Sequence, residues 1–293
     1  MAFNLQTFRT RTLTAIIFAA VMLLGLLWNQ WSFFILFSVI HFGCWVEYQR
    51  LVGLIDNEYQ KITPFHKYGV MIAGWCIMLW FTNDGFNIFG LRLHELGWWM
   101  GPLFIFVLPI MELMLAKNVR LKNIGHSAFG LVYISLSLGL LTDLYGISIY
   151  FNDVTGSPDL ATRWSIPLVI IGALWVNDTM AYIIGSLFGK HPLSKISPKK
   201  TWEGTMGGLV LTVGIAGLTG YLLDLKIESL MITATVAAVA GIFGDLLESK
   251  LKRLAGVKDS GSFMPGHGGF LDRFDSMLLA ALFVWLYINI FAA

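Results

Sequence analysis

Long stretches with apolar residues on every helical face recur along the chain, and they decide its fold class. A soluble helix keeps a polar stripe, and a buried strand is only about 4 to 8 residues long, so neither explains these stretches. A membrane-crossing helix needs about 20 predominantly apolar residues, and fewer suffice where its ends snorkel or the bilayer thins. The sequence therefore predicts nine spans, at approximately 12–28, 31–50, 67–82, 98–116, 125–143, 165–188, 205–223, 229–248 and 276–292.

The overall composition agrees with a membrane protein. Apolar residues make up 56% of the chain and charged residues 13%, whereas a soluble domain carries about 25% charged residues. The formal net charge of +2 provides no bulk attraction for nucleic acid, so we expect no nucleic-acid partner. We predict an all-α fold, a polytopic transmembrane helical bundle.

The distribution of lysine and arginine indicates how this bundle is oriented. Short cytoplasmic loops collect basic residues, and a miscounted span would scramble that alternation. With a cytoplasmic amino terminus, 17 of the 20 basic residues fall in cytoplasmic segments, and only Arg92, Arg163 and Lys226 fall outside. The first apolar run ends in bulky residues that suit no signal peptidase, so we expect it to be retained as a span.

Two parts of the chain are expected to differ in role. Residues 1–150 form about five amino-terminal transmembrane helices, and residues 151–293 form a catalytic transmembrane region with cytoplasmic loops 190–204 and 249–275. Tryptophans near span ends are expected to anchor the helices at the membrane interface. These are Trp28, Trp31, Trp45, Trp80, Trp98, Trp99 and Trp285.

An ionisable side chain inside a span is expensive, which makes Asp178 a candidate functional residue. The alternative is a structural carboxyl satisfied by neighbouring hydroxyl groups. Ala181, Gly185 and Gly189 follow at a spacing of four, and such a stripe of small residues lets another helix approach closely. Helix packing explains that stripe without any catalytic role.

Polar residues also gather where the eighth predicted span ends. If the helix continues past this point, Asp245, Glu248, Ser249 and Lys252 share one face, because residues three, four and seven apart lie above one another. The alternative is an ordinary solvated helix end.

A glycine-rich segment precedes the ninth predicted span. His267, Gly268 and Gly269 form a turn whose backbone N–H groups, at the start of a helix, favour a phosphate group. Asp272 and Arg273 follow within one turn and offer a carboxylate for a metal ion and a guanidinium for a phosphate. The glycine turn alone is a weak signal, and the acidic and basic residues after it make it specific.

The other cytoplasmic loop carries lysines and hydroxyl groups. Ser197, Lys199, Lys200 and Thr201 lie together beside the membrane. Such lysines can bind a substrate phosphate, or they can attract anionic headgroups at about 1 kcal/mol per charge.

These segments together resemble the integral-membrane phosphatidate cytidylyltransferases, also called CDP-diacylglycerol synthases. The family's motif reads Ser-x-apolar-Lys-Arg, four residues, Lys-Asp, a gap of small residues, and Pro-x-His-Gly-Gly-apolar-x-Asp-Arg-apolar-Asp. It is filled here by Ser249, Leu251, Lys252, Arg253, Lys258, Asp259, Gly261, Pro265, His267, Gly268, Gly269, Phe270, Asp272, Arg273, Phe274 and Asp275. Met264 replaces another apolar residue. The resemblance covers about residues 175–275, including upstream segments 178–190 and 197–204.

The resemblance implies that the phosphate of phosphatidic acid attacks the α-phosphorus of CTP and that pyrophosphate leaves. Such a transfer depends on positioning and charge neutralisation. The implied metal ligands, for Mg²⁺ with room for a second cation, are Asp245 and Asp272. Asp178 either binds the ion or holds a group that does, and His267 either binds a phosphate or holds the turn.

The resemblance also implies which residues meet the substrates. The residues implied to clamp the triphosphate and lipid phosphate are Lys200, Lys252, Arg253 and Arg273. Further substrate contacts are implied for Ser197, Lys199, Thr201, Lys258, Gly268 and Gly269.

Other interpretations of the sequence predict different products. A polyprenol kinase would use CTP without leaving cytidine on the lipid, and an ion-coupled transporter would explain an intramembrane acid such as Asp178. A scaffold would have no use for costly buried carboxylates. We expect an enzyme of the bacterial inner membrane with its active site on the cytoplasmic face, and the sequence leaves open whether it is a homodimer.

Overall fold

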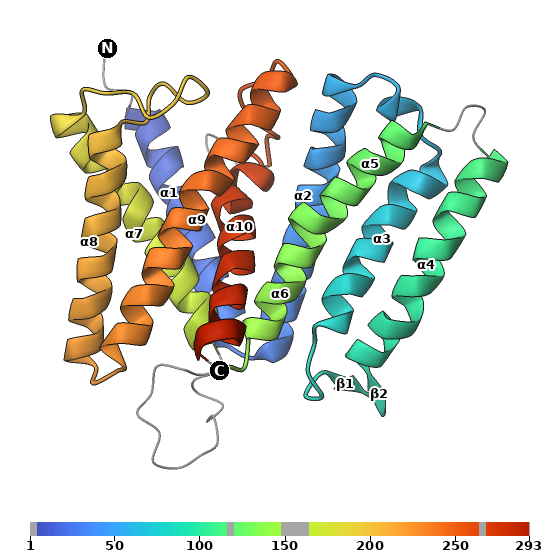
Figure 1. Ribbon diagram of the computed structural model, residues 1–293, viewed down its shortest axis with the longest axis horizontal. Helices are drawn as coiled ribbons and strands as arrows, with labels where there is room; N and C mark the ends of the chain where they lie inside the picture. Colours follow the sequence, from blue (N-terminus) through green and yellow to red (C-terminus); the bar gives the residue numbers. More distant parts are fainter. Residues whose placement is uncertain (1–4, 116–119, 148–163, 264–267, 293) are drawn as a thin grey trace. The chain divides into compact units, whose positions relative to one another are not determined.

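The computed structural model describes residues 5–115, 120–147, 164–263 and 268–292, and this part of the chain is almost entirely helical (Figure 1). The sheet within it is one small antiparallel pair, β1 (Asn87–Ile88) with β2 (Leu91–Arg92). The helices are α1 (Leu5–Leu27), α2 (Gln30–Ile55), η1 (Tyr59–Lys61), α3 (Pro64–Trp80), α4 (Leu93–Leu115), α5 (Leu121–Gly130), η2 (Leu131–Leu136), α6 (Ser137–Leu144), α7 (Ser165–Phe188), α8 (Trp202–Leu222), α9 (Ile227–Leu254), α10 (Leu271–Tyr287) and η4 (Ile288–Ala292).

The predicted all-α class is confirmed. Seven helices among the described residues are long and apolar enough to cross a membrane: α2, α4, the run α5–η2–α6, α7, α8, α9 and the run α10–η4. The two remaining predicted spans fall in α1, whose apolar part is the shorter segment Thr12–Leu27, and in α3, which has 17 residues. The count of nine spans and the cytoplasmic amino terminus stay predictions.

Side chains at the helix starts explain where several of these elements begin. At α2, Asn29 Oδ1 accepts from the Ser32 backbone N–H at 2.8 Å, and Ser32 Oγ accepts from the Asn29 N–H at 3.0 Å. At α3, Thr63 Oγ1 accepts from the His66 N–H, and Pro64 fills the first helical position, where no N–H is required. These caps satisfy amide groups that the helices themselves leave without acceptors.

The chain forms two compact units that do not follow its sequence order. The amino-terminal unit contains residues 1–142 together with 251–274, and the carboxyl-terminal unit contains residues 143–250 together with 275–293. The last turn of α9, the glycine-rich loop and the first turn of α10 therefore group with the amino-terminal helices. The predicted division of roles between residues 1–150 and 151–293 stays a prediction.

Aromatic side chains and close helix contacts build the amino-terminal unit. A Cβ at Gly97 of α4 would collide with the backbone of α3 at Trp80 and Cys76, so glycine allows these two helices to touch. Trp45 of α2 is fully buried, and its Nε1–H donates to Ser135 Oγ at 2.9 Å. The predicted interfacial role of Trp45 is therefore wrong, because its indole finds a hydrogen-bond partner inside the protein.

A separate polar cluster of the same unit lies between α3, α4 and α5. Glu112 Oε2 accepts from Thr63 Oγ1 at 2.7 Å, and Glu112 Oε1 lies 3.3 Å from His66 Nδ1. His66 Nε2 and Tyr59 OH lie 2.8 and 3.0 Å from Ser127 Oγ. This buried cluster consists of neighbours within α3–α5 and the η1 turn, and Glu112 is its carboxylate.

In the carboxyl-terminal unit, small residues bring α7 and α8 together. A Cβ at Gly204 would lie 2.6 Å from the Ala181 carbonyl oxygen and 2.9 Å from Gly185 Cα. A Cβ at Gly208 would lie 2.8 Å from the Asn177 carbonyl oxygen. The close helix contact predicted along Ala181 and Gly185 is confirmed.

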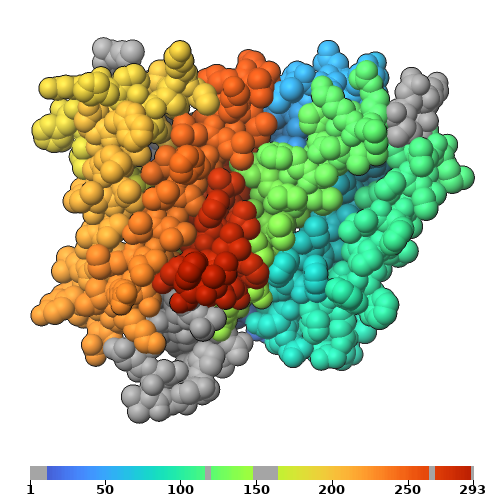
Figure 2. Space-filling model, viewed as in Figure 1, coloured from blue at the N-terminus to red at the C-terminus, as the bar shows by residue number. Residues whose placement is uncertain are grey.

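Large apolar side chains cover the outer faces of individual helices. Figure 2 shows the surface of α4 in blue-green along the right edge. Among the residues of α4, Trp99, Phe106 and Met114 are exposed. Val210 and Leu218 are exposed in the same way on α8. Surfaces of this composition suit hydrocarbon rather than water, as the long apolar stretches predict.

Candidate active site

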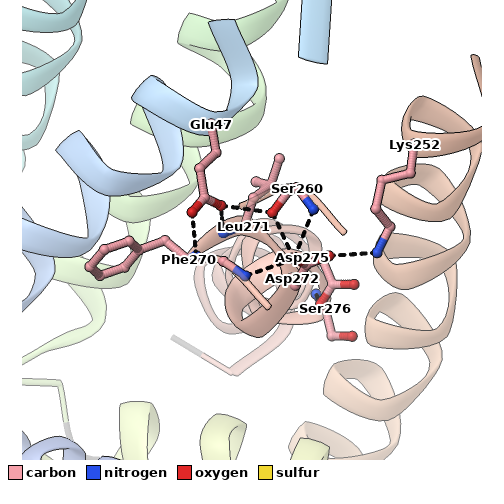
Figure 3. A network of polar contacts seen from close by, with 9 residues as sticks. Glu47, Lys252, Ser260, Phe270, Leu271, Asp272, Asp275 and Ser276 are labelled. Atoms are coloured by element: carbon pink, nitrogen blue, oxygen red, sulfur yellow. Dashed lines mark hydrogen bonds and ion pairs between the residues drawn. The ribbon is translucent and has the colours of Figure 1, made fainter. Parts of the chain in front are cut away.

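Asp272, in the first turn of α10, lies at the centre of a polar network in the amino-terminal unit (Figure 3). Its Oδ2 accepts from the backbone N–H groups of Ser260 and Gly269 at 2.9 and 2.8 Å, and Ser260 Oγ lies 2.9 Å away. Its Oδ1 forms an ion pair with Lys252 Nζ at 2.7 Å. The side chains of Lys252 and Asp272 are only 14% and 6% exposed, so the protein shields this pair from solvent.

The glycine turn before α10 has the backbone conformation that this network requires. Gly268 has a φ of +83°, a region that residues with a Cβ rarely adopt. A Cβ there would also lie 2.6 Å from Asp272 Oδ2. The Gly269 N–H is thereby aimed at Asp272, which is a different use from the phosphate contact predicted for this turn.

A second buried carboxylate, Glu47 of α2, completes the network. Its Oε1 accepts from the Phe270 N–H and its Oε2 from the Leu271 N–H, both at 2.9 Å. Ser260 Oγ donates to Glu47 Oε2 at 2.7 Å. Sequence reasoning missed Glu47, although it lies inside the predicted span 31–50 and the argument that singled out Asp178 applies equally to it.

The other predicted metal ligand, Asp245 of α9, forms an ion pair with Lys200 in the carboxyl-terminal unit. Their side chains are 23% and 33% exposed. The loop before α8 presents Lys200 because it folds back on itself. The Leu193 N–H donates to the Lys200 carbonyl at 2.7 Å, and the Lys200 N–H donates to the Ser197 carbonyl at 3.1 Å.

Backbone and side-chain contacts also order the rest of that loop. Glu203 Oε2 accepts from the N–H groups of Lys190 and His191, and Glu203 Oε1 lies 2.6 Å from His191 Nδ1. Thr201 caps α8 by accepting from the Gly204 N–H. Glu203 and Thr201 therefore stabilise the conformation of this loop through hydrogen bonds.

The remaining predicted site residues lie in varied environments. Asp178 is exposed on α7, and Glu248 is fully buried on α9. The helix continuity expected after Asp245 is confirmed, because α9 runs to Leu254. Exposed side chains are found at Lys199, Arg253, Lys258 and Arg273. His267 lies outside the described residues.

Two sets of predicted residues are thus brought together, one in each unit. Lys252, Gly269 and Asp272 form the first set, and Lys200 with Asp245 forms the second. An approach of Asp245 to Asp272 stays a prediction.

The donor chemistry at these two carboxylates fits a hard divalent cation. Mg²⁺ prefers oxygen ligands and keeps several waters, so one or two carboxylates suffice. The described residues contain no cluster of three or more histidine, cysteine, aspartate or glutamate side chains suited to a metal. Lysine and a metal ion would compete for Asp245 and Asp272, and a lysine that turned toward a phosphate would release its carboxylate.

Comparison with known proteins identifies relatives that are named phosphatidate cytidylyltransferase. The model of the family described as "Cytidylyltransferase family" matches residues 9–291. The phosphatidate cytidylyltransferase of Staphylococcus saprophyticus is 32% identical over 273 residues, which cover 92% of this chain and 95% of the relative. That of Bacillus subtilis is 30% identical over 222 residues, covering 74% of this chain and 76% of the relative.

Plant proteins of the same name match over a shorter region. Phosphatidate cytidylyltransferase 5, chloroplastic, of Arabidopsis thaliana is 35% identical over 202 residues, covering 63% of this chain and 50% of the relative. The chain thus spans about half the length of the plant relatives it matches.

Proposed function

Because this chain belongs to the cytidylyltransferase family, we propose that it transfers the cytidylyl group of CTP to phosphatidic acid, forming CDP-diacylglycerol for phospholipid biosynthesis. The observation that carries the proposal is the match to the Staphylococcus saprophyticus phosphatidate cytidylyltransferase over nearly the full length of both proteins. That match covers 92% of this chain and 95% of the relative.

In the proposed reaction, a phosphate oxygen of phosphatidic acid forms a bond to the α-phosphorus of CTP. The bond from that phosphorus to the pyrophosphate oxygen breaks, and pyrophosphate leaves with the electron pair. Such a reaction requires positioned phosphates and positive charge around them. Bound Mg²⁺ would neutralise charge on the triphosphate, and Asp245 and Asp272 would hold it.

A feature of α9 supports the proposed approach of these two carboxylates. A Cβ at Gly244, the residue before Asp245, would lie 2.5 Å from the carbonyl oxygen of Asp275 and 3.0 Å from Ser276 Cα. Asp275 follows Asp272 by three residues at the start of α10. The absence of a side chain at Gly244 therefore lets α9 touch α10 at Asp275 and Ser276.

Lysine and arginine residues would clamp the phosphates. Lys200 and Lys252 lie against the proposed metal ligands, so they can exchange a carboxylate for an incoming phosphate oxygen. Arg253 and Arg273 would add bidentate contacts. Further substrate contacts are proposed for Ser197, Lys199, Thr201, Lys258, Gly268 and Gly269. Asp178 would bind the ion or hold a group that does, and His267 would bind a phosphate or hold the turn.

The proposed site opens at the cytoplasmic face of the bacterial inner membrane, in a protein with nine spans and a cytoplasmic amino terminus. Seven suitable helices and the 17 to 3 distribution of basic residues support this arrangement. A site at the interface lets CTP remain in water while the acyl chains of phosphatidic acid remain in lipid.

A direct test is incubation of the detergent-purified protein with radiolabelled CTP, phosphatidic acid and Mg²⁺. We expect a lipid that carries cytidine and a matching amount of pyrophosphate. A phosphorylated lipid without cytidine would support a CTP-dependent kinase instead. Purified protein that consumes no CTP with phosphatidic acid would overturn the proposal.

A further inference from the structure

Glu47 is a buried acid whose hydrogen bonds within the described part of the chain reach one distant segment. Its side chain comes from α2, and the residue as a whole is 7% exposed. Its carboxylate accepts from Ser260, Phe270 and Leu271, more than 200 residues later in the chain. Burying a carboxylate is costly unless hydrogen bonds replace its hydration, and here the start of α10 supplies two of them.

The shape of the loop also depends on the Glu47 carboxylate. A Cβ at Gly261 would collide with Glu47 Oε1, and a Cβ at Gly269 would collide with both carboxylate oxygens. One turn earlier on α2, a Cβ at Gly43 would lie 2.5 Å from the ring of Phe270. Two loop glycines and one glycine of α2 thus leave the space in which Glu47 and Phe270 pack. The close packing of α2 against the loop depends on all three.

Glu47 is connected to Asp272 through a single hydroxyl group. Ser260 Oγ lies 2.7 Å from Glu47 Oε2 and 2.9 Å from Asp272 Oδ2. Figure 3 shows that Glu47 and Asp272 both contact Ser260 and that Asp272 also reaches Lys252. A displacement of Ser260 would therefore disturb the hydrogen bonds of Asp272, the residue that pairs with Lys252.

We propose that Glu47 is a positioning residue of the cytidylyl-transfer site: it holds Ser260 and the turn at 268–271 on α2 so that Asp272 and Lys252 are presented together to metal and phosphate. This inference rests on the proposed function. It also assigns a task to the amino-terminal helices, which lie within the part of the chain that the family model matches. Their part in the reaction is to provide the acid that orders the catalytic loop.

The central experiment compares Glu47→Gln and Glu47→Asp with Glu112→Gln as the matched control. Glu112 is another buried glutamate of the amino-terminal unit, but its partners are Thr63 and His66. Glu47→Gln turns an amide N–H₂ toward backbone N–H donors, so one of their hydrogen bonds is lost. Glu47→Asp keeps the carboxylate, but its side chain is one methylene shorter. Cytidylyl transfer, the Mg²⁺ concentration for half-maximal rate and thermal unfolding are measured for each purified variant.

We expect Glu47→Gln to lower kcat or raise the required Mg²⁺ concentration on the order of 10- to 100-fold, as for other groups that orient a metal ligand. Glu47→Asp should recover part of this loss, and Glu112→Gln should remain near wild type in both measurements. A Glu47→Gln enzyme with wild-type kcat and Mg²⁺ dependence would overturn the proposal. So would a Glu112→Gln variant that loses as much activity at the same loss of stability.

Hydrogen–deuterium exchange separates this inference from the proposed function, because it needs no substrate. In the Glu47 variants, peptides containing 260–263 and 268–271 should exchange faster, while α4 peptides should exchange as in the wild type. If the wild-type protein forms no cytidine-bearing lipid, the proposed function fails and the exchange data still test the Glu47 contact. Unchanged exchange in 260–271 would refute it even if transfer is lost.

A double-mutant cycle provides a further test. It compares paired variants, so a loss of stability that they share does not affect the result. Gly261→Ala should be damaging in the wild type, because the methyl group collides with Glu47, and nearly harmless in the Glu47→Ala background. Additive effects on transfer and on loop exchange would show that the glycine and the glutamate act independently, contrary to the proposal.

Discussion

Asp272 and Asp245 were predicted to play the same part, yet the two units hold them in different ways. Asp272 is 6% exposed in its side chain and takes hydrogen bonds from Ser260 and Gly269 as well as an ion pair with Lys252. Asp245 has a side chain that is 23% exposed and an ion pair with Lys200. Asp272 is thus part of the local fold, whereas Asp245 is held by charge, and the two should respond differently to substitution.

The largest effect is expected for Asp272→Asn. The amide keeps one acceptor oxygen and places donors against Lys252 or the backbone N–H groups of the loop, so both the proposed metal site and the fold lose an interaction. An unsatisfied buried group costs about 1–3 kcal/mol. Each kcal/mol corresponds to roughly 2–4 °C in a protein of this size class. Transfer should be abolished and the midpoint of thermal unfolding in detergent should fall by several degrees.

Asp245→Asn should abolish transfer equally but leave the thermal midpoint close to that of the wild type, because Asp245 is half-buried and paired with a lysine. Both measurements are made on the same preparations as for Asp272→Asn. Near-normal formation of CDP-diacylglycerol by either variant would refute the metal assignment. A larger loss of stability for Asp245→Asn than for Asp272→Asn would reverse the comparison between the two acids.

The lysines that pair with these two acids should also differ, with smaller effects on transfer. Lys252→Gln should slow transfer more than Lys200→Gln, because Lys252 is 14% exposed and Lys200 is 33% exposed. A charge-assisted hydrogen bond contributes about 1.5–3 kcal/mol, so a loss on the order of 10-fold in kcat/KM is expected for Lys252→Gln. Raising the salt concentration should reduce the effect of Lys200→Gln more, because exposed charges are screened. Equal effects at every salt concentration would contradict the difference.

The ion pair of Asp56 with Lys122, whose lysine side chain is 67% exposed, should give the smallest effect. The hydrogen bond from Lys122 holds the pKa of Asp56 below its ordinary value, and the Glu58 N–H adds to this. A depressed pKa means that the pair stabilises the fold above the pKa of the unfolded chain and loses that contribution as pH falls through the folded-state pKa. Asp56→Asn should lower the thermal midpoint slightly at neutral pH and not at pH values below the folded-state pKa. A constant difference at all pH values would exclude this origin.

Much of the architecture and half of the site network could be predicted from local pattern. Apolar stretches of span length predicted the helices, and the small residues Ala181 and Gly185 predicted the close contact with α8. The pairing of charges near the end of α9 and the start of α10 also lay within the predicted region, since Lys252 and Asp272 were both expected in the site. These features are local because helix periodicity and span length need only neighbouring residues.

Glu47 and Trp45 show where local pattern failed. Both lie on α2 in a stretch that reads as an ordinary span, and nothing nearby reveals that Glu47 meets Phe270 or that Trp45 meets Ser135. Trp45 was expected at the membrane interface because tryptophan is common there, but a partner from another helix buried it. The sequence rule for intramembrane acids could have marked Glu47 as important without identifying its partner.

Apolar content and helical periodicity were enough to establish an all-α membrane protein, and a few polar segments were enough to indicate its family. The contacts of Glu47 with Ser260, Phe270 and Leu271 are visible only in the folded chain. A helix in hydrocarbon needs an apolar composition along its own length, so each span can be predicted from its own segment of the sequence. A hydrogen bond from Glu47 to Leu271 joins residues 224 positions apart, and only the packing of α2 against the loop brings them within 2.9 Å.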